Sequence, residues 1–435
     1  MSKKIKIIFL LIGLVLVWVS SNLNFGRKNW QYIVEADAKG YYAYLPAIFI
    51  YHDLNFGFFD QIEKEKYYNV NTFYDYRIGW KNKVIDKYYI GVAVAQSPFF
   101  LMAHGLTHAT GKDPDGYSYW YPVFVNIAAI FYGMLGLFAL YKWLRLKNIS
   151  ENNAAWAMVI CAFGTHLFYY IIGEGGMSHV YSFFWINMWL WSTTLFAQQC
   201  SKKMLLLSMF ILGMITITRP VNALIIAAFP LLFENPRDSI AFVKKHLFAL
   251  LPSLTLGAII LAMTIGIQML YYYVATGDLW VYSYGEEGFN FASPHFLDIL
   301  FSYKKGLFLY TPICLLGTVL AFVTTGNFRK QLIYWLLFFI FITYVLSSWW
   351  MWYYGGSFSS RVYVEYLFVF IWPLAAYLES ATSKFKLTVV KSMAIALLLI
   401  CQIQTYQYRY FQIHWVDMTQ EKYWDVFLRL DLIKR

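Results

Sequence analysis

Long apolar runs separated by short polar segments make up most of the chain. About 20 apolar residues cross a bilayer, so we interpret eleven of the runs as membrane-spanning helices. The fifth and sixth are short and meet at Arg219-Pro220, so they could be tilted or could form a hairpin that crosses only in part. The predicted spans are residues 5–21, 119–141, 154–172, 180–199, 204–218, 220–234, 247–270, 306–324, 331–348, 363–379 and 388–404.

This pattern predicts an all-α polytopic membrane protein that forms one domain over residues 1–435. The polar stretch at residues 22–118 is far longer than an ordinary connection. We expect it to form an extracytoplasmic first loop that carries juxtamembrane helices. An apolar run at residues 88–108 lies inside this loop. Gln96, Pro98 and His104 interrupt the run, so we interpret it as an interfacial or re-entrant helix.

The positions of the Lys and Arg residues predict the orientation of the spans. With the N-terminus inside, sixteen of these residues fall on the inner side, and only four fall on short outer connections: Arg219, Lys304, Lys305 and Arg361. This asymmetry follows the positive-inside rule and places the first loop and the C-terminal tail, residues 405–435, outside. Residues 1–21 could be a signal peptide or a first span. Trp18 precedes a weak Ser20-Ser21 cleavage site, which favours the span.

Composition narrows the possible functions. The chain is 60% hydrophobic and carries a net charge of +11, which would suggest a nucleic-acid partner in a soluble domain. Here the orientation of the spans explains the basic residues better, and we find no nucleic-acid signal. The four cysteines lie in or at the ends of apolar runs without the spacing of metal ligands. Neither a disulfide framework nor a zinc site is predicted.

The segment Glu35–Pro46, directly after the first span, is the strongest candidate for an active site. It places the carboxylates Glu35 and Asp37 two residues apart and follows them with Tyr41 and Tyr42. A carboxylate can remove the proton of an acceptor hydroxyl, and aromatic rings suit sugars and lipid headgroups. The alternative is that Asp37 caps a helix and the tyrosines are interfacial anchors.

Four further groups of polar residues fall on the same predicted outer face, and such a one-sided arrangement is typical of a substrate site. Lys304 and Lys305 oppose the orientation rule, which suggests a lipid phosphate as their partner, although ordinary snorkelling would also place them there. The candidate residues are Glu174 and His179, Arg219, Glu286 with Lys304 and Lys305, and Trp352 with Arg361. Arg361 suits bidentate phosphate recognition, and Trp352 suits a sugar face or an interfacial belt.

Several short motifs match a known family. They are Glu35-Ala36-Asp37, Gly40-Tyr41-Tyr42, Leu45-Pro46, Arg219-Pro220, Lys304-Lys305-Gly306-Leu307-Phe308 with Pro312, and Gly355-Gly356-Ser357-Phe358 with Arg361. The chain resembles the polyprenyl-phosphate-sugar-dependent glycosyltransferases of the GT-C superfamily, related to the protein-mannosyltransferase-like and aminoarabinose-transferase-like enzymes.

The resemblance implies an inverting hexosyl- or pentosyltransferase in the bacterial plasma (inner) membrane, with its active site on the extracytoplasmic face. It implies that a polyprenyl-phosphate-linked sugar is the donor and that a glycan, lipid or protein is the acceptor. Asp37 would be the base, assisted by Glu35, and Lys304, Lys305, Arg361 and Arg219 would bind the donor phosphate. Tyr41, Tyr42, Glu174, His179, Glu286 and Trp352 would contact the sugar or acceptor. No cofactor is certain, and a divalent metal is possible.

Two other classes remain open from the residues alone. A secondary transporter or lipid flippase would also have about eleven spans broken by Pro and Gly. Such proteins usually show matching halves and polar groups at mid-membrane depth, whereas here the polar groups gather on one face. A membrane scaffold with a binding loop is the third possibility, but it leaves the clusters of acids and bases unexplained.

Overall fold

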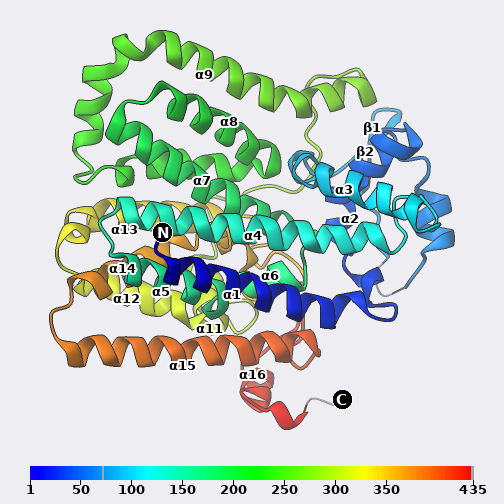
Figure 1. Ribbon diagram of the computed structural model, residues 1–435. Helices are drawn as coiled ribbons and strands as arrows, with labels where there is room; N and C mark the ends of the chain where they lie inside the picture. The colour runs from blue at the N-terminus through cyan, green and yellow to red at the C-terminus, as the bar shows by residue number, and fades with distance from the viewer. Residues whose placement is uncertain (71–72, 433–435) are drawn as a thin grey trace.

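The computed structural model describes residues 1–70 and 73–432, and it is almost entirely helical. The axes of most long helices lie roughly parallel, side by side, as Figure 1 shows. The α-helices are α1 (Lys3–Ser20), α2 (Asp37–Pro46), α3 (Gly91–Ala109), α4 (Trp120–Leu146), α5 (Glu151–Gly164), α6 (Leu167–Ile172), α7 (Ser178–Gln199), α8 (Lys202–Thr218), α9 (Asp238–Thr276), α10 (Phe296–Phe301), α11 (Leu307–Tyr310), α12 (Pro312–Val323), α13 (Asn327–Ser347), α14 (Phe368–Ser380), α15 (Lys384–Arg409) and α16 (Gln420–Val426).

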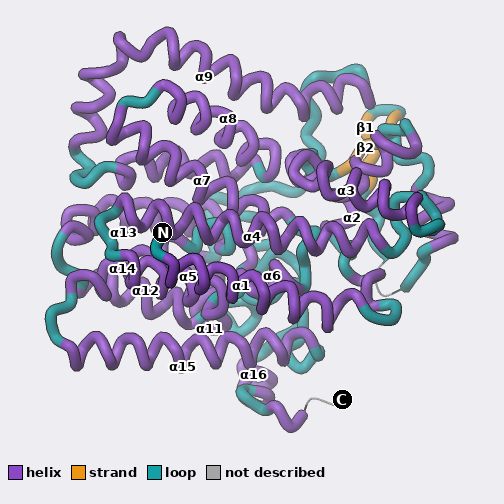
Figure 2. Tube along the Cα trace, in the orientation of Figure 1, coloured by secondary structure: helices purple, strands orange, loops and turns teal. Residues whose placement is uncertain are grey.

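The remaining elements are short, as the small share of strand in Figure 2 shows. The strands β1 (Arg77–Trp80) and β2 (Lys83–Asp86) pair antiparallel, with Arg77 opposite Asp86. Other helical turns are η1 (Ser21–Phe25), η2 (Asn29–Tyr32), η3 (Ala47–Tyr51), η4 (Asp60–Lys66), η5 (Pro220–Leu232), η6 (Arg361–Tyr363) and η7 (Leu430–Leu432). The expectation of an all-α fold is therefore confirmed.

Each of the eleven predicted spans coincides with a helix or with two consecutive helices. Five helices are long and apolar enough to cross a membrane by length and composition: Lys3–Phe25, Trp120–Leu146, Asp238–Thr276, Asn327–Ser347 and Lys384–Arg409. The segments Pro220–Leu232, Pro312–Val323 and Phe368–Ser380 are shorter apolar helices. The total of eleven spans and the orientation stay predictions.

The short fifth and sixth predicted spans correspond to α8 and η5, which meet at Arg219. Pro220 has no amide hydrogen to donate and occupies the first turn of η5, where that loss costs least. The thirteen residues of η5 form a 3-10 helix. At a rise of about 2.0 Å per residue it is about 26 Å long, as long as the seventeen α-helical residues of α8 at about 1.5 Å each. The 3-10 geometry thus makes the thirteen residues of η5 about as long as the seventeen residues of α8.

The first loop forms a lobe at one end of the helix bundle, at the right of Figure 1, where α2, α3 and the hairpin gather. This lobe has its own hydrophobic cluster, separate from the main cluster between the long helices. The residues predicted as interfacial or re-entrant form α3, which lies against α4 through the hydrogen bond from the Tyr132 hydroxyl to the Ala95 carbonyl, at 2.8 Å. Gly91 lets α3 begin against the end of α8, because a Cβ there would lie 2.5 Å from the Thr218 nitrogen.

Candidate active site

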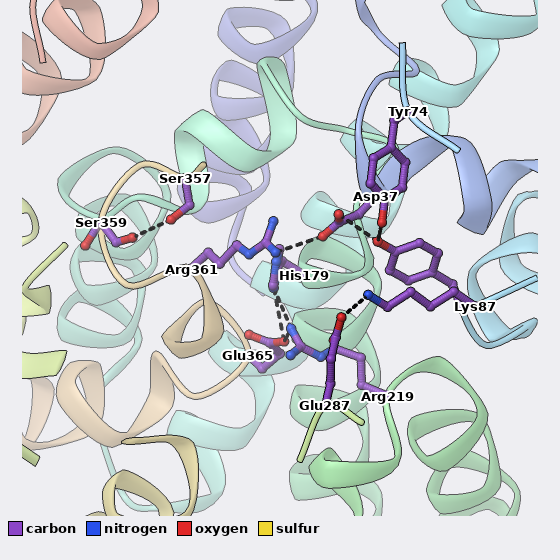
Figure 3. A network of polar contacts seen from close by, with 11 residues as sticks. Asp37, Tyr74, Lys87, His179, Arg219, Glu287, Ser357, Ser359, Arg361 and Glu365 are labelled. Carbon is purple, nitrogen blue, oxygen red and sulfur yellow. Dashed lines mark hydrogen bonds and ion pairs between the residues drawn. The ribbon is translucent and has the colours of Figure 1, made fainter. Parts of the chain in front are cut away.

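A cavity of about 450 Å³ opens where the lobe meets the ends of the helices. Seven parts of the chain line it: α2, Tyr74 before β1, the segment from β2 to α3, the start of α7, the junction of α8 with η5, and the two segments around residues 282–289 and 349–361. Its charged or titratable polar lining residues are Asp37, Lys87, His179, Arg219, Glu287 and Arg361. Figure 3 shows that these side chains converge from the different elements.

Asp37 is the first residue of α2, and both of its carboxylate oxygens have partners. Its Oδ2 accepts a hydrogen bond from Nη2 of Arg361 at 2.8 Å, and its Oδ1 accepts one from the Tyr88 hydroxyl at 2.8 Å. The side chains of Asp37 and Arg361 are 23% and 13% exposed, so this ion pair is largely withdrawn from water. Burial by itself raises the pKa of Asp37, but Arg361 and Tyr88 outweigh it and hold the pKa below its usual value. Asp37 is therefore ionised at neutral pH.

Tyr88 is held in place by a glycine and by a second tyrosine. A Cβ on Gly40 would lie 2.3 Å from Cδ2 of Tyr88, so only glycine lets the ring lie against α2. The hydroxyl of Tyr74 lies 2.6 Å from that of Tyr88. Because Tyr88 donates its proton to Asp37, the Tyr74 hydroxyl donates to Tyr88. A chain of two hydroxyls thus ends on the carboxylate.

A buried group of three side chains forms another part of the cavity wall. Nδ1 of His179 lies 3.1 Å from Oε1 of Glu365 and 3.2 Å from Nη1 of Arg219. The same Nη1 donates to Oε1 of Glu365 at 3.1 Å, as Figure 3 shows. The side chains of Glu365 and His179 are 1% and 3% exposed. A buried carboxylate needs a cation or several hydrogen-bond donors, and Arg219 is the cation that forms a salt bridge with Glu365.

A third ion pair lies at the cavity and joins two distant segments. Nζ of Lys87 lies 2.5 Å from Oε1 of Glu287 and 5.4 Å from the centre of the Tyr284 ring. The hydroxyl of Ser283 donates to the Lys87 carbonyl at 2.7 Å. The rest of the wall is mainly aromatic, with Tyr41, Tyr74, Tyr88, Tyr89, Tyr282, Tyr284, Phe289, Trp349, Trp350 and Tyr354. Charged groups at fixed points and aromatic faces between them suit a ligand that has an anionic part and a sugar or lipid part.

Of the residues predicted from the sequence, Asp37, Tyr41, His179, Arg219 and Arg361 line this cavity. The others lie outside the lining. Tyr42 is buried in the lobe, where its hydroxyl donates to the Gly116 carbonyl. Glu286 is exposed, whereas the next residue, Glu287, reaches the cavity. Trp352 stacks on His295, with 5.5 Å between ring centroids.

The two predicted glutamates lie outside the cavity lining, where Glu174 is close to Arg361 and Glu35 is close to Lys39 and Arg409. Burial raises the pKa of each carboxyl group to about 7. The charge of Glu35 also raises the pKa of Glu174, and both carboxylates raise the pKa of Tyr169. Oε1 of Glu174 accepts a hydrogen bond from the Tyr169 hydroxyl at 3.0 Å, while its Oε2 is covered without a partner among the described residues. His179 pairs with Glu365 and not with Glu174, its near neighbour in sequence.

Lys304 and Lys305 also lie outside the cavity lining. Nζ of Lys304 is 3.6 Å from the centre of the Tyr353 ring, a cation–π contact. Lys305 is 2% exposed and donates to the Ser357 carbonyl. Burial lowers the pKa of Lys305 to about 7. The two cations thus contact the segment that leads to Arg361, while Arg219 and Lys87 reach the cavity itself.

The donor set of the cavity does not suit a divalent metal. Among residues 1–70 and 73–432 no three His, Cys, Asp or Glu side chains come together as ligands. Each carboxylate of the site already has a cation: Asp37 has Arg361, Glu365 has Arg219, and Glu287 has Lys87. A metal would have to displace one of these cations, so no chemical step below is assigned to it.

Sequence reasoning did not identify Lys87, Tyr88, Glu287 or Glu365. A signal was available for Glu365, because an ionisable residue inside an apolar run is costly and usually functional. Lys87 was counted only as part of the first loop, and Tyr88 only as the start of the apolar run 88–108. Nothing in the sequence relates them to Asp37, since the contact depends on how the lobe folds back on itself.

The fold and the cavity define a polytopic helical protein with a pocket of acids, bases and aromatic rings at one end of its helix bundle. No protein-family model matches the sequence, and no curated protein matches it. Solved structures of an oligosaccharyltransferase from Archaeoglobus fulgidus are similar in fold at low identity.

One of them is the archaeal oligosaccharyltransferase AglB in complex with an inhibitory peptide and a dolichol-phosphate, with 12% identity and a TM-score of 0.47 over 98% of this chain and 58% of that one. The apo form gives 12% identity and a TM-score of 0.46 over 98% and 60%. A complex of the same enzyme with Zn and sulfate has 11% identity and a TM-score of 0.40, over 95% of this chain and 54% of that one. The present chain thus spans less than two thirds of the length of these neighbours.

Proposed function

We propose that this protein is an integral-membrane inverting glycosyltransferase that moves a single hexosyl or pentosyl group from a polyprenyl-phosphate donor to a glycan, lipid or protein acceptor. The observation that carries the proposal is the cavity that brings the Asp37 carboxylate together with Arg361, Arg219 and Lys87 between aromatic walls. We place this cavity on the extracytoplasmic face of the bacterial plasma membrane, where the charge asymmetry of the sequence puts the first loop.

Asp37 is the proposed general base. It is ionised, and its position at the start of α2 puts it in the cavity wall, where an acceptor hydroxyl can reach it. In the transfer, the acceptor oxygen forms a bond to the anomeric carbon and its proton passes to Asp37. The bond from the anomeric carbon to the phosphate oxygen breaks, and the electron pair leaves with the polyprenyl phosphate. One carboxylate suffices because attack from the face opposite the leaving group inverts the sugar in a single step.

The cations of the cavity would bind the donor phosphate and stabilise the charge that it gains on leaving. The two recorded contacts of Arg219, with Glu365 and with His179, both use Nη1, so its Nη2 and Nε are the nitrogens left for a phosphate. Lys87 is paired with the partly exposed Glu287, so it could turn toward an anion at modest cost. Arg361 would stay on Asp37 and bind the anion through its Nε, which is buried without a partner among the described residues. The phosphate role predicted for Lys304 and Lys305 would need a rearrangement, since both have other partners.

The test is transfer by the purified protein in lipid nanodiscs from short-chain polyprenyl phosphates that carry radiolabelled glucose, mannose, galactose or arabinose. Acceptors extracted from the host membrane are supplied in excess. We expect one donor to be consumed with release of polyprenyl phosphate, and Arg219→Gln to raise the apparent donor KM about 10-fold or more, because a hydrogen bond to a charged group contributes roughly 1.5 to 3 kcal/mol. Transbilayer movement of an intact donor without any transfer would overturn the proposal in favour of a flippase.

A further inference from the structure

The three side chains His179, Glu365 and Arg219 come from three separate elements and meet at the cavity. His179 lies in the first turn of α7, Arg219 follows α8, and Glu365 lies just before α14. Oε1 of Glu365 is 3.1 Å from both Nδ1 of His179 and Nη1 of Arg219. Three chain segments therefore hold one imidazole ring against a buried carboxylate.

This contact determines which ring nitrogen of His179 carries the proton. If Nδ1 were unprotonated, its lone pair would face the lone pairs of a buried carboxylate at 3.1 Å, which is repulsive. A proton on Nδ1 instead gives a charge-assisted hydrogen bond to Glu365, and Arg219 donates to the same oxygen. The contact of 3.2 Å between Nδ1 and Nη1 of Arg219 then joins two donors that share one acceptor, and it is not itself a hydrogen bond. In a neutral imidazole the other nitrogen, Nε2, is then an acceptor. Because Nδ1 faces Glu365 and His179 lines the cavity, Nε2 is the nitrogen left for a ligand.

We propose that Nε2 of His179 accepts a hydrogen bond from the 2-hydroxyl of the transferred sugar, and that Glu365 is the positioning residue that keeps Nε2 unprotonated. This proposal rests on the proposed function. We assign the 2-hydroxyl, and not another hydroxyl of the sugar, because His179 and Arg219 lie only 3.2 Å apart. If Arg219 binds the phosphate on the anomeric carbon, His179 lies beside the neighbouring ring position. The 2-hydroxyl is the donor nearest to that phosphate.

Such a contact would act on the rate as well as on binding. In glycosyl transfer the ring carbon gains positive charge, and hydrogen bonds to the 2-hydroxyl strengthen in the transition state. An acceptor on the protein that draws the hydroxyl proton away increases electron density next to that carbon. His179 would therefore touch the substrate, whereas Glu365 acts only through His179.

The first test needs no substrate. Protein labelled with ¹⁵N-histidine is studied in nanodiscs by solid-state NMR, and the His179 signals are assigned by their loss in His179→Gln. We expect a protonated Nδ1 and an unprotonated Nε2 in the wild type at pH 7.5. Glu365→Gln should shift the ring toward the Nε2-protonated tautomer, and Glu365→Asp should retain the wild-type state at least in part. A protonated Nε2 in the wild type overturns the proposal, whether or not the Glu365 variants fold.

The second test compares each transferred donor with its 2-deoxy analogue in the wild type and in His179→Phe. The ratio of the two kcat/KM values is compared between the proteins, so that the intrinsic reactivity of the donors cancels. We expect the preference for the 2-hydroxy donor to fall about 10-fold in His179→Phe, equal to about 1.4 kcal/mol. His295→Phe, the same change at a histidine outside the cavity lining, should leave the ratio unchanged.

These outcomes separate the two proposals. A shift of less than about 2-fold in His179→Phe shows that His179 does not contact the 2-hydroxyl, while the glycosyltransferase function stands. Absence of transfer from every donor refutes the function and, with it, the sugar contact. In that case the NMR result still decides whether Glu365 sets the tautomer of His179.

Discussion

Replacing Asp37 by Asn tests the centre of the site, because it removes the charge of the carboxylate and keeps its size. Asp37 accepts hydrogen bonds of 2.8 Å from Arg361 and from Tyr88. An amide offers one acceptor oxygen, so one of the two donors loses its partner. As the general base contributes a factor of about 10² to 10⁴, we expect turnover to fall by at least 100-fold, or about 2.7 kcal/mol or more of barrier.

The same change should also lower stability, contrary to what the position of Asp37 in a hydrophilic loop suggests. The guanidinium of Arg361 is only 13% exposed and would lose its carboxylate. A hydrogen bond to a charged group is worth roughly 1.5 to 3 kcal/mol, and partial exposure of the pair reduces this to about 1 to 2 kcal/mol. We therefore expect a measurable decrease in the apparent Tm, and not the near wild-type stability of a loop substitution.

Two matched variants separate these effects. Asp37→Asn combined with Arg361→Gln removes both charges, so stability should recover toward that of the wild type while transfer stays absent. Glu35→Gln removes the neighbouring carboxylate, which lies outside the cavity lining, and should reduce turnover less than Asp37→Asn does. Transfer is measured with donor and acceptor varied separately, and the apparent Tm is measured by intrinsic fluorescence in the same nanodiscs.

The result that refutes the reasoning is retained catalysis. If Asp37→Asn keeps a tenth or more of wild-type turnover, the lost barrier is about 1.4 kcal/mol or less, too little for a general base. Asp37 would then be a structural partner of Arg361, and the base would have to be sought among the other cavity residues.

Three further predictions follow from other parts of the molecule. Gly40→Ala should displace Tyr88, since the added Cβ would lie 2.3 Å from the ring of Tyr88. We expect it to lower kcat about as much as Tyr88→Phe does, and an unchanged kcat would show that the ring can move without effect. Burial raises the pKa of Glu174 from 4.5 to about 7, so its protonated form stabilises the fold below pH 4.5 and this contribution is lost as the pH rises to about 7. Relative to Glu174→Gln, the wild type should lose about 2 kcal/mol of stability between pH 5 and 7.5, seen as a falling Tm; parallel Tm profiles would contradict this. An impermeant maleimide should label Asp60→Cys but not Lys244→Cys in intact cells, and the reverse pattern would overturn the orientation.

The helices could be predicted from the sequence because the signal is local and strong. An apolar run of 15 to 25 residues forms a helix wherever it lies, since its backbone groups must be satisfied within the segment. The boundaries of α4, α7 and α13 accordingly lie close to the predicted spans. The split of the third predicted span into α5 and α6 was not predicted, because the break at Thr165-His166 depends on tertiary contacts such as the one between His166 and Thr311, at 2.9 Å.

The site could be predicted only as far as its residues are marked by their own local pattern. Asp37 was found because it lies in a hydrophilic loop next to another acid and several tyrosines. Its partner Arg361 was found separately, but their contact joins positions 324 residues apart. Glu174 and His179 were grouped as candidates because they are close in sequence, whereas the fold brings Glu365 to His179 across 186 residues. Pairings of this kind are set by how helices pack, and no single segment encodes them.

Lys305 shows why a charge that opposes the orientation rule need not touch a ligand. Its side chain is buried and donates to the Ser357 carbonyl, within a segment where Tyr354 and Ser359 both have positive φ angles, near +55° and +58°. Such backbone is strained for residues other than glycine and persists only when its surroundings fix it. Arg361 lies two residues after Ser359 and reaches Asp37 from this strained segment. The cation thus stabilises the backbone that aims Arg361, so the lysine that the orientation rule marked as unusual contacts a backbone carbonyl beside the candidate site.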